Sequence, residues 1–404
     1  MGRGGPEQCA PHPGLQFIRI RPGSWTATGP LGSRHISRVQ LLVRSHALNC
    51  IEFRNVGRCE ASVIGSSDAS GYLRPGDHLK LGERVLLACG VRPMWLPELR
   101  GYPGFEFGAP DLAGVIGETP QAWEIRRRIA LAARESGHVL IRGGSGTGKE
   151  LAARAIHLLS ARGNKPMVAR NAATFPETLI DAELFGNTRN YPNPGMPERP
   201  GLIGEADGST LLLDEIGELP HGLQAHLLRV LDGGEYQRLG EASSRRADVR
   251  VIAATNRELD CLKHDLVARF KIRVNLPELD ARSEDLPLLA RHLLKDSGRT
   301  LTPEQISRLL RHQYSAGVRE FETLLRELAL GDDPLADPPD SPKPRRPRSE
   351  FPSRSQIEQA SIGEDEIRHA LREQGGRQER VWRALGLSSR HALRRLMRKY
   401  GIEP

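Results

Sequence analysis

The chain has 404 residues, of which 38% are hydrophobic and 27% are charged, and its 58 basic and 50 acidic side chains leave a formal charge of +8. No apolar run approaches the roughly 20 residues that a membrane-spanning helix needs, so we expect no integral membrane protein. The N-terminal residues lack the apolar segment of a secretory signal, and the five cysteines are scattered and odd in number. A disulfide framework and a zinc site are therefore disfavoured, and we expect a cytoplasmic protein.

A chain of this length is expected to have two to four domains. Residues 15–95 carry short apolar runs separated by Gly, Pro, Asn and Asp, which predicts a small β-sandwich that would serve as a sensory domain. Residues 96–112 are rich in Gly, Pro and aromatic residues and are predicted to be a linker. Over residues 113–330 helical stretches alternate with apolar strands, a pattern typical of an α/β domain with a mostly parallel sheet.

The remaining residues differ sharply in composition. Residues 331–361 are dense in proline and charge, so we expect an extended linker without a packed core. Residues 362–404 show a helical pattern, which predicts an all-α domain. The last 64 residues hold 15 basic and 8 acidic side chains, nearly all of the excess positive charge. This asymmetry favours a polyanion partner such as DNA, although a solubilising tail would have the same charge.

A glycine-rich loop follows the apolar segment 138–142, and a helical pattern begins directly after the loop. Glycines let backbone N–H groups turn toward phosphate oxygens, and the start of the helix adds partial positive charge. We therefore predict that ATP binds here, with Lys149 reaching the β- and γ-phosphates. Glu150 stands where a Ser or Thr usually contacts Mg²⁺. The predicted nucleotide-binding residues are Gly143, Gly144, Ser145, Gly146, Thr147, Gly148, Lys149 and Glu150.

Two more predicted strands end in polar side chains. The apolar run 210–213 ends in Asp214 and Glu215, and α/β sheets bind ligands at the carboxyl ends of their strands. We expect Asp214 to hold Mg²⁺, directly or through water, and Glu215 to orient or deprotonate the attacking water. Asn256 ends the other strand and is a candidate to hold the γ-phosphate or the water. An acidic pair alone is weak evidence, but together with Lys149 it indicates phosphoryl transfer.

Residues 114–330 resemble the AAA+ ATPase domain of bacterial enhancer-binding proteins, the activators of sigma-54 RNA polymerase. The matching segments are GGSGTGKE, ELFG, ADGSTLLLDEIGELP, LQAHLLRVLDGGEYQRLGE, DVRVIAATNREL, LPELDARSEDLPLLARHLL and GVREF. The resemblance covers roughly half of the chain. It implies an AAA+ α/β P-loop domain with a helical lid that hydrolyses ATP with Mg²⁺. It also implies a ring, usually a hexamer, because each site is built from two subunits.

The resemblance assigns roles to single residues. Residues 143–150 match the Walker A loop, in which Glu at position 150 is usual. The other matched positions within the subunit are Asp214 and Glu215 (Walker B), Asn171, Thr255 and Asn256 (first sensor), and Arg319 (second sensor). Asn171 matches the polar residue that holds the Walker B glutamate inactive until the assembly is engaged.

The two arginine fingers of the family reach the nucleotide of the neighbouring subunit. They fall on Lys263 and Arg269. A lysine keeps the positive charge but lacks the planar guanidinium, so the first finger departs from the family pattern. From their helical context alone, Arg269 and Arg319 are both candidates to neutralise the transition state, although a surface ion pair is the commoner role of a single arginine.

The family loop Gly-Ala-Phe-Thr-Gly-Ala, which contacts sigma-54, is altered here. Its positions are Asn190, Tyr191, Pro192, Asn193, Pro194 and Gly195. Pro192 replaces the Phe and Asn193 replaces the Thr, and the two prolines fix φ in a loop that must move. Tyr191 is an alternative aromatic residue, one position away. We therefore keep two hypotheses, an ATP-hydrolysing polymerase remodeller and a DNA-bound regulator that binds ATP without remodelling sigma-54 polymerase.

Residues 364–402 resemble a Fis-type helix-turn-helix. Ser388 is a candidate N-cap of the second helix, whose polar side the resemblance directs toward DNA. The candidate DNA contacts are Ser388, Ser389, Arg390, His391, Arg394 and Arg395. The alternative is a basic helical hairpin that only packs against other parts of the protein.

The N-terminal region resembles a forkhead-associated (FHA) domain, a β-sandwich that binds phosphothreonine. The resemblance rests on residues 37–40 and on the segment LRPGDHLKLG. It implies that Ser37 and Arg38 bind the phosphate of a partner protein, although Gln40 replaces the family's His. The alternative is a sandwich that only packs or dimerises.

Overall fold

The computed structural model describes residues 15–335 except 48, 64–68, 177 and 333, together with Arg394 and Met397. The chain divides into two compact units, residues 1–336 and 337–404. In the second unit Arg394 is exposed and Met397 is buried, and both are helical. The other candidate DNA contacts lie outside the described residues; they are Ser388, Ser389, Arg390, His391 and Arg395.

Small antiparallel sheets form the N-terminal part of the first unit. The strands are β1 (Phe17–Arg21), β2 (Ser24–Thr28), β3 (Leu41–Ala47), β4 (Cys50–Asn55), β5 (Ala61–Val63), β6 (Ser70–Leu73), β7 (His78–Leu81) and β8 (Val85–Ala88). Strands β1 and β2 pair alone, and two three-stranded sheets have the orders β3-β4-β6 and β5-β7-β8. Side chains from both three-stranded sheets, including Phe53 and Leu81, bury one common apolar cluster. We call residues 15–95 the β-domain.

A parallel sheet of five strands follows, in the order β10-β11-β14-β9-β15. The strands are β9 (Val139–Arg142), β10 (Val168–Asn171), β11 (Thr210–Asp214), β14 (Arg250–Thr255) and β15 (Ile272–Asn275). Their side chains alternate between two apolar clusters. On β9, for example, Leu140 joins one cluster, and Val139 and Ile141 join the other.

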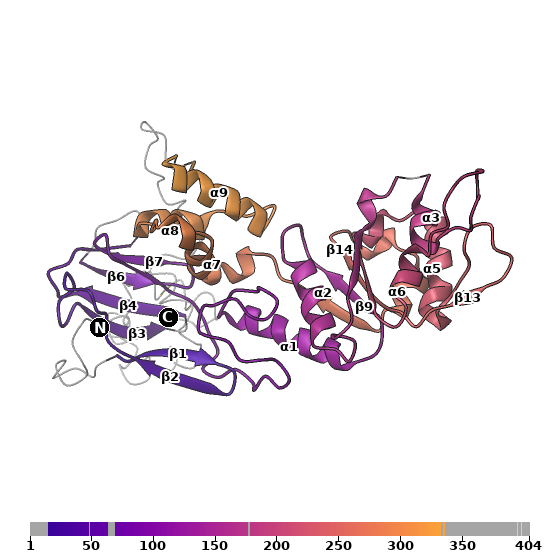
Figure 1. The fold of residues 1–404 in the computed structure, drawn as a ribbon. Coiled ribbons are helices and arrows are strands. Elements are labelled where there is room, and N and C mark those ends of the chain that lie inside the picture. Colours follow the sequence, from indigo (N-terminus) through magenta and orange to yellow (C-terminus); the bar gives the residue numbers. More distant parts are fainter. Residues whose placement is uncertain are drawn as a thin grey trace. The chain divides into compact units, whose positions relative to one another are not determined.

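Helices cover both faces of this sheet (Figure 1). One face packs against α1 (Pro120–Arg134) and α2 (Lys149–Leu158). The other face packs against α3 (Ile180–Phe185), α4 (Gly201–Glu205), α5 (His221–Gly233) and α6 (His264–Arg269). A short hairpin of β12 (Glu235–Tyr236) and β13 (Arg245–Arg246) follows α5. Because both faces are buried, the inner strands β9, β11 and β14 are mostly apolar, as expected for a parallel sheet.

Three helices after β15 pack around a separate apolar cluster. They are α7 (Leu286–Leu293), α8 (Pro303–Arg311) and α9 (Val318–Leu330), and we call them the helical subdomain. Thr302 caps α8 by accepting a hydrogen bond from Gln305, with Pro303 in the first turn. Gly331, in a left-handed conformation, ends α9.

The structure therefore has the expected antiparallel N-terminal part and the expected central α/β part with helices. Short 3-10 helices complete it; they are η2 (Ala172–Thr174), η3 (Ile216–Glu218), η4 (Leu259–Cys261), η5 (Asp280–Asp285) and η6 (Lys295–Ser297). Within the described ranges, no helix combines the length and the apolar character needed to cross a bilayer.

Candidate nucleotide-binding site

The glycine-rich segment forms a loop between β9 and α2, at the carboxyl end of the central sheet. We call residues 143–148 the phosphate loop. Gly146 and Gly148 have φ angles of +70° and +94°, which favour glycine. The amides of Ser145, Gly146 and Gly148 donate no hydrogen bond within the described part of the chain. Such free amides next to a helix N-terminus can bind the oxygens of an anion.

The helical subdomain touches the phosphate loop at Gly146. The amide of Val318 donates to the carbonyl oxygen of Gly146 over 3.1 Å. A Cβ atom on Gly146 would lie 2.2 Å from the carbonyl oxygen of Ala316, so no side chain fits there without moving the backbone. Arg319 follows this contact on α9, and its side chain is exposed. The second-sensor candidate is therefore one residue from a direct contact with the loop.

Lys149 connects the phosphate loop with the acidic strand end. Its side chain is 7% exposed, and its ammonium donates to the carbonyl oxygens of Gly143 and Gly144 over 3.1 Å each. The same nitrogen lies 3.4 Å from Glu215 Oε1. The two motifs, which are 66 positions apart in the sequence, thus meet at one ion pair.

Asp214 ends β11 in the same area, and Glu215 follows it directly. Asp214 Oδ1 accepts a hydrogen bond from the Glu215 amide over 3.0 Å, and Glu215 Oε2 accepts from the Asn256 amide over 3.1 Å. Burial raises the pKa of the Asp214 carboxyl, and the neighbouring Glu215 charge raises it further. The Glu215 amide and the Lys149 charge act in the opposite direction. Asp214 therefore carries its negative charge at an energetic cost in this environment.

This donor set is compatible with Mg²⁺. A half-buried carboxylate at a strand end suits an ion that keeps several waters and takes its remaining ligands from substrate phosphates. Within the described ranges, no group of three His, Cys, Asp or Glu side chains forms a metal site by itself. Asp214 would then be the protein's carboxylate ligand, and the phosphates would have to supply further oxygens.

The neighbouring strands bring the sensor candidates to the same sheet edge. Asn171 ends β10 directly opposite Asp214 in the strand register. Its side-chain oxygen accepts a hydrogen bond from the Ala173 amide over 2.9 Å, and among the described residues it makes no hydrogen bond with Glu215. Thr255 is buried, and its hydroxyl accepts from the Arg257 amide. In this structure the Asn171 side chain therefore acts as the N-cap of η2.

The two finger candidates lie at the two ends of α6, away from this sheet edge. Lys263 precedes the helix and donates its amide to Gln224 Oε1, and its ammonium has no ion pair in the described part of the structure. Arg269 ends the helix and makes a two-pronged ion pair with Asp232 at the end of α5. In the described part of the structure, Arg269 is thus held in an ion pair, whereas the Lys263 ammonium is in none.

Comparison with known proteins identifies the same region. Residues 115–276 match the family model described as the sigma-54 interaction domain. The regulatory protein AtoC of Escherichia coli is 34% identical over 317 residues, covering 72% of this chain and 68% of AtoC. This chain belongs to the sigma-54 interaction domain family. Sequence, fold and motif geometry therefore agree on the central domain.

Other members of this family match a shorter part. The Nif-specific regulatory protein of Azotobacter vinelandii is 40% identical over 246 residues, or 58% of this chain and 46% of that protein. The chain thus spans about half the length of the curated relatives it matches. Crystal structures of NtrX from Brucella abortus, with ADP and with ATP, are 28% identical with TM-scores of 0.51 and 0.50. They cover 72% and 75% of this chain and 70% and 71% of NtrX.

The 190–195 loop is held by hydrogen bonds from the side chains of Asn187, which precedes it, and Asn190. Asn187, which is fully buried, donates through Nδ2 to the carbonyl oxygens of Thr188, Tyr191 and Pro197. Inside the loop, Asn190 Oδ1 accepts from the Gly195 amide. The Tyr191 ring packs over Gly240, where an added Cβ would lie 2.6 Å from it, and is 43% exposed. The 190–195 loop therefore presents a fixed turn with one aromatic ring at its surface.

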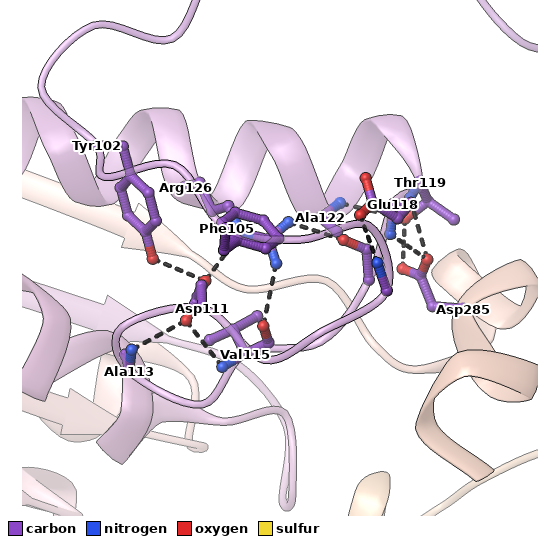
Figure 2. A network of polar contacts seen from close by, with 12 residues as sticks. Tyr102, Phe105, Asp111, Ala113, Val115, Glu118, Thr119, Ala122, Arg126 and Asp285 are labelled. Atoms are coloured by element: carbon purple, nitrogen blue, oxygen red, sulfur yellow. Dashed lines mark hydrogen bonds and ion pairs between the residues drawn. The ribbon is translucent and has the colours of Figure 1, made fainter. Parts of the chain in front are cut away.

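The sequence analysis did not predict a buried ion pair at the start of the domain (Figure 2). Arg126 of α1 is fully buried, and its Nε donates to Asp111 Oδ2 over 2.8 Å. Tyr102 donates its hydroxyl to the same carboxylate, and the Phe105 ring lies 4.5 Å from the guanidinium carbon. Residues 102–111, predicted as part of a linker, thus pack against α1. The signal for Arg126 is its position between Ala122 and Ile129 on the apolar face of the helix.

A second set of buried contacts joins this region to the helical subdomain (Figure 2). Asp285, just before α7, accepts hydrogen bonds from the amides of Glu118 and Thr119 and from the Thr119 hydroxyl. Glu118 in turn binds Arg21 of β1 through two hydrogen bonds. The segment before α1 is therefore held by both the helical subdomain and the β-domain.

Proposed function

We propose that this protein is an ATP-hydrolysing transcription regulator that works as a ring and couples hydrolysis to remodelling of a polymerase. The observation that carries the proposal is the meeting of Lys149 with Glu215 beside a phosphate loop with free amides. Free amides and an ammonium suit phosphate, and the carboxylates suit a metal ion and a water nucleophile. The family membership of the chain supports the same activity.

Each side chain has one task in this proposal. Lys149 moves from the loop carbonyls to the β- and γ-phosphates and neutralises charge there. Asp214 holds Mg²⁺, whose positive charge favours the ionised carboxylate that burial disfavours. Glu215 orients the attacking water and accepts its proton, and Asn256 positions the γ-phosphate or the water. Mg²⁺, when bound, supplies charge neutralisation at the transferred phosphoryl group.

Three further residues complete the site in the assembled ring. Lys263 and Arg269 would reach the phosphates bound by the neighbouring subunit, and Arg319 would contact the nucleotide of its own subunit. The free ammonium of Lys263 and the position of Arg319 next to the loop contact support these roles. Asn171 would exchange its Ala173 contact for Glu215 when hydrolysis has to be prevented.

ATP turnover tests the enzymatic proposal. We expect Glu215→Gln to lower turnover by about 10²–10⁴-fold, since general-base catalysis contributes that much, while ATP still binds. Glu218→Gln is a matched control, because Glu218 is nearby but pairs with Arg257 on the surface. Wild-type turnover no faster than that of Glu215→Gln would refute the proposal.

The 190–195 loop favours a second candidate, a DNA-bound regulator that binds ATP without remodelling sigma-54 polymerase. The hydrogen bonds that Asn187 and Asn190 make to the loop backbone, and the two prolines of the loop, support it. Binding of sigma-54 in the presence of ADP and aluminium fluoride, which mimic the transition state, separates the two candidates. Binding would support polymerase remodelling, and normal turnover without binding would support the second candidate.

We propose that residues 362–404 form a helix-turn-helix that binds DNA, and that residues 331–361 are a linker between it and the central domain. The net positive charge of the last 64 residues supports this. A chain ending at Leu330 should lose duplex binding. Equal affinity of the shortened chain would refute the helix-turn-helix proposal.

We also propose that the β-domain binds a phosphothreonine partner at Ser37 and Arg38. The Ser37 hydroxyl accepts a hydrogen bond from the Arg58 amide, which places the exposed Arg38 and Arg58 on two linked loops. Gln40 is fully buried and holds this arrangement through Ser37, Asn55 and Cys59. Arg38→Ala should abolish binding of a phosphothreonine peptide. Arg44→Ala, which changes an exposed residue of β3, should not.

A further inference from the structure

The ion pair between Arg269 and Asp232 joins the ends of two helices on the surface of the central domain. Arg269 donates through Nε and Nη2 to the two carboxylate oxygens of Asp232. The two side chains are 43% and 49% exposed. This fork-to-carboxylate geometry is the one in which a guanidinium also binds phosphate oxygens. Arg269 cannot serve both acceptors at the same time.

Asp232 is poorly placed for the stability of its own helix. It lies in the last turn of α5, which ends at Gly233, and no basic residue shares that turn. The C-terminal end of a helix carries partial negative charge, so a carboxylate there is unfavourable. A residue that conflicts with its local structure points to another role, and among the described residues the ion pair that Asp232 makes is with Arg269.

We propose that Asp232 is a positioning residue that holds Arg269 within its own subunit until a neighbouring subunit presents nucleotide phosphates. The proposal rests on the ring ATPase proposed above and specifies how its second finger is controlled. Bound ATP and its phosphates replace the carboxylate as the acceptor of the same guanidinium fork. Lys263, whose ammonium is free in the described part of the structure, needs no such exchange.

Replacing Asp232 by phosphate as the partner of Arg269 costs little free energy. Exposed ion pairs contribute little, because water screens them and both side chains lose freedom. The pair therefore shifts the balance between separate subunits and an active ring by about two- to fivefold. Asp232 then sets the protein concentration at which the ring becomes active, and leaves the chemical step unchanged.

Asp232→Asn tests this in the full-length protein, with turnover measured over a range of protein concentrations at saturating ATP and Mg²⁺. We expect half-maximal turnover at a protein concentration about two- to fivefold lower than in the wild type. Turnover per subunit at high protein concentration should stay within about twofold. A purely structural role of Asp232 would not lower the half-maximal protein concentration while leaving the turnover per subunit unchanged.

Two variants serve as controls. Glu322→Gln removes a comparable exposed ion pair, with Arg326 on α9, and should leave the concentration dependence unchanged. Arg269→Ala should lower turnover at every concentration, and adding Asp232→Asn to it should have no further effect. An unchanged concentration dependence in Asp232→Asn, with normal wild-type turnover, would overturn this inference. Absence of wild-type turnover at every concentration would instead refute the proposed ATPase.

Discussion

The phosphate loop and the 190–195 loop are both irregular turns rich in Gly or Pro, yet they are stabilised in opposite ways. In the phosphate loop, the amides of Ser145, Gly146 and Gly148 have no acceptor among the residues that the structure describes. In the 190–195 loop, the buried side chain of Asn187 binds the surrounding backbone carbonyls. A loop with free amides can receive an anion, whereas a loop whose backbone carbonyls are bound by a buried side chain presents a fixed surface. The difference predicts that a substitution in each loop affects a different property.

The largest effect is expected when the charge of the phosphate loop is removed. Lys149→Ala should lower ATP turnover by about 10²–10³-fold, the usual loss when a group that stabilises transition-state charge is deleted. Lys271→Ala, at an exposed position after α6, is the control and should stay within about twofold. Steady-state turnover at saturating ATP measures both. Retained activity in Lys149→Ala would remove the basis for distinguishing the two loops.

Alanine at a positive-φ glycine in each loop sharpens the comparison. In Gly146→Ala the new Cβ meets the Ala316 carbonyl at 2.2 Å, so we expect at least tenfold weaker ATP binding and a lower Tm. Gly195 has a φ of +90° with nothing within 4 Å of an added Cβ. Gly195→Ala should therefore carry only backbone strain of about 1 kcal/mol and leave ATP binding intact. Calorimetry of ATP binding and thermal unfolding would show both effects.

Asn187→Ala should release the 190–195 loop. Three hydrogen bonds are lost, which predicts destabilisation by about 1–3 kcal/mol and faster proteolytic cleavage between residues 188 and 197. Turnover of ATP should change little. Asn193→Ala, at an exposed position of the same loop, is the control. Equal cleavage of the two variants would show that Asn187 does not fix the loop.

The smallest effect concerns the charge of Asp214 without nucleotide or Mg²⁺. Because the folded-state pKa of Asp214 is raised, its ionisation lowers stability as pH rises from the usual Asp pKa of about 4 through the folded-state value. Asp214→Asn should therefore give a small rise in Tm at neutral pH. The gain should disappear as pH falls below about 4. A gain that is independent of pH would exclude this cause.

The parts of the site that the sequence predicts are those encoded locally. The phosphate loop follows from a strand, glycines and a helix in immediate succession, and Asp214 follows from the end of an apolar strand. The meeting of Lys149 with Glu215 could be expected because parallel strands end at one edge of the sheet. The central fold was predictable for the same reason.

Contacts between distant and individually ordinary residues were not predictable. The helical spacing of Arg126 from Ala122 and Ile129 is a weak signal, because Arg126 also stands in a run of three arginines that indicates a solvated helix face, and its partner Asp111 lies outside the helix. The pair of Arg269 and Asp232 depends on how α5 and α6 pack. Asn187 gives no sign in the sequence that it fixes a loop. Such contacts are set by tertiary packing, on which local pattern carries no information.

The hydrogen bond from the Val318 amide to the Gly146 carbonyl makes hydrogen exchange at Val318 a measure of contact between the helical subdomain and the phosphate loop. Any motion that lifts the helical subdomain from the phosphate loop must break it and expose this single amide to solvent. Deuterium uptake at Val318 therefore measures how often the site opens, independently of turnover. Exchange that slows on ATP binding would show closure on the nucleotide, and exchange that accelerates would show that phosphates displace the helical subdomain.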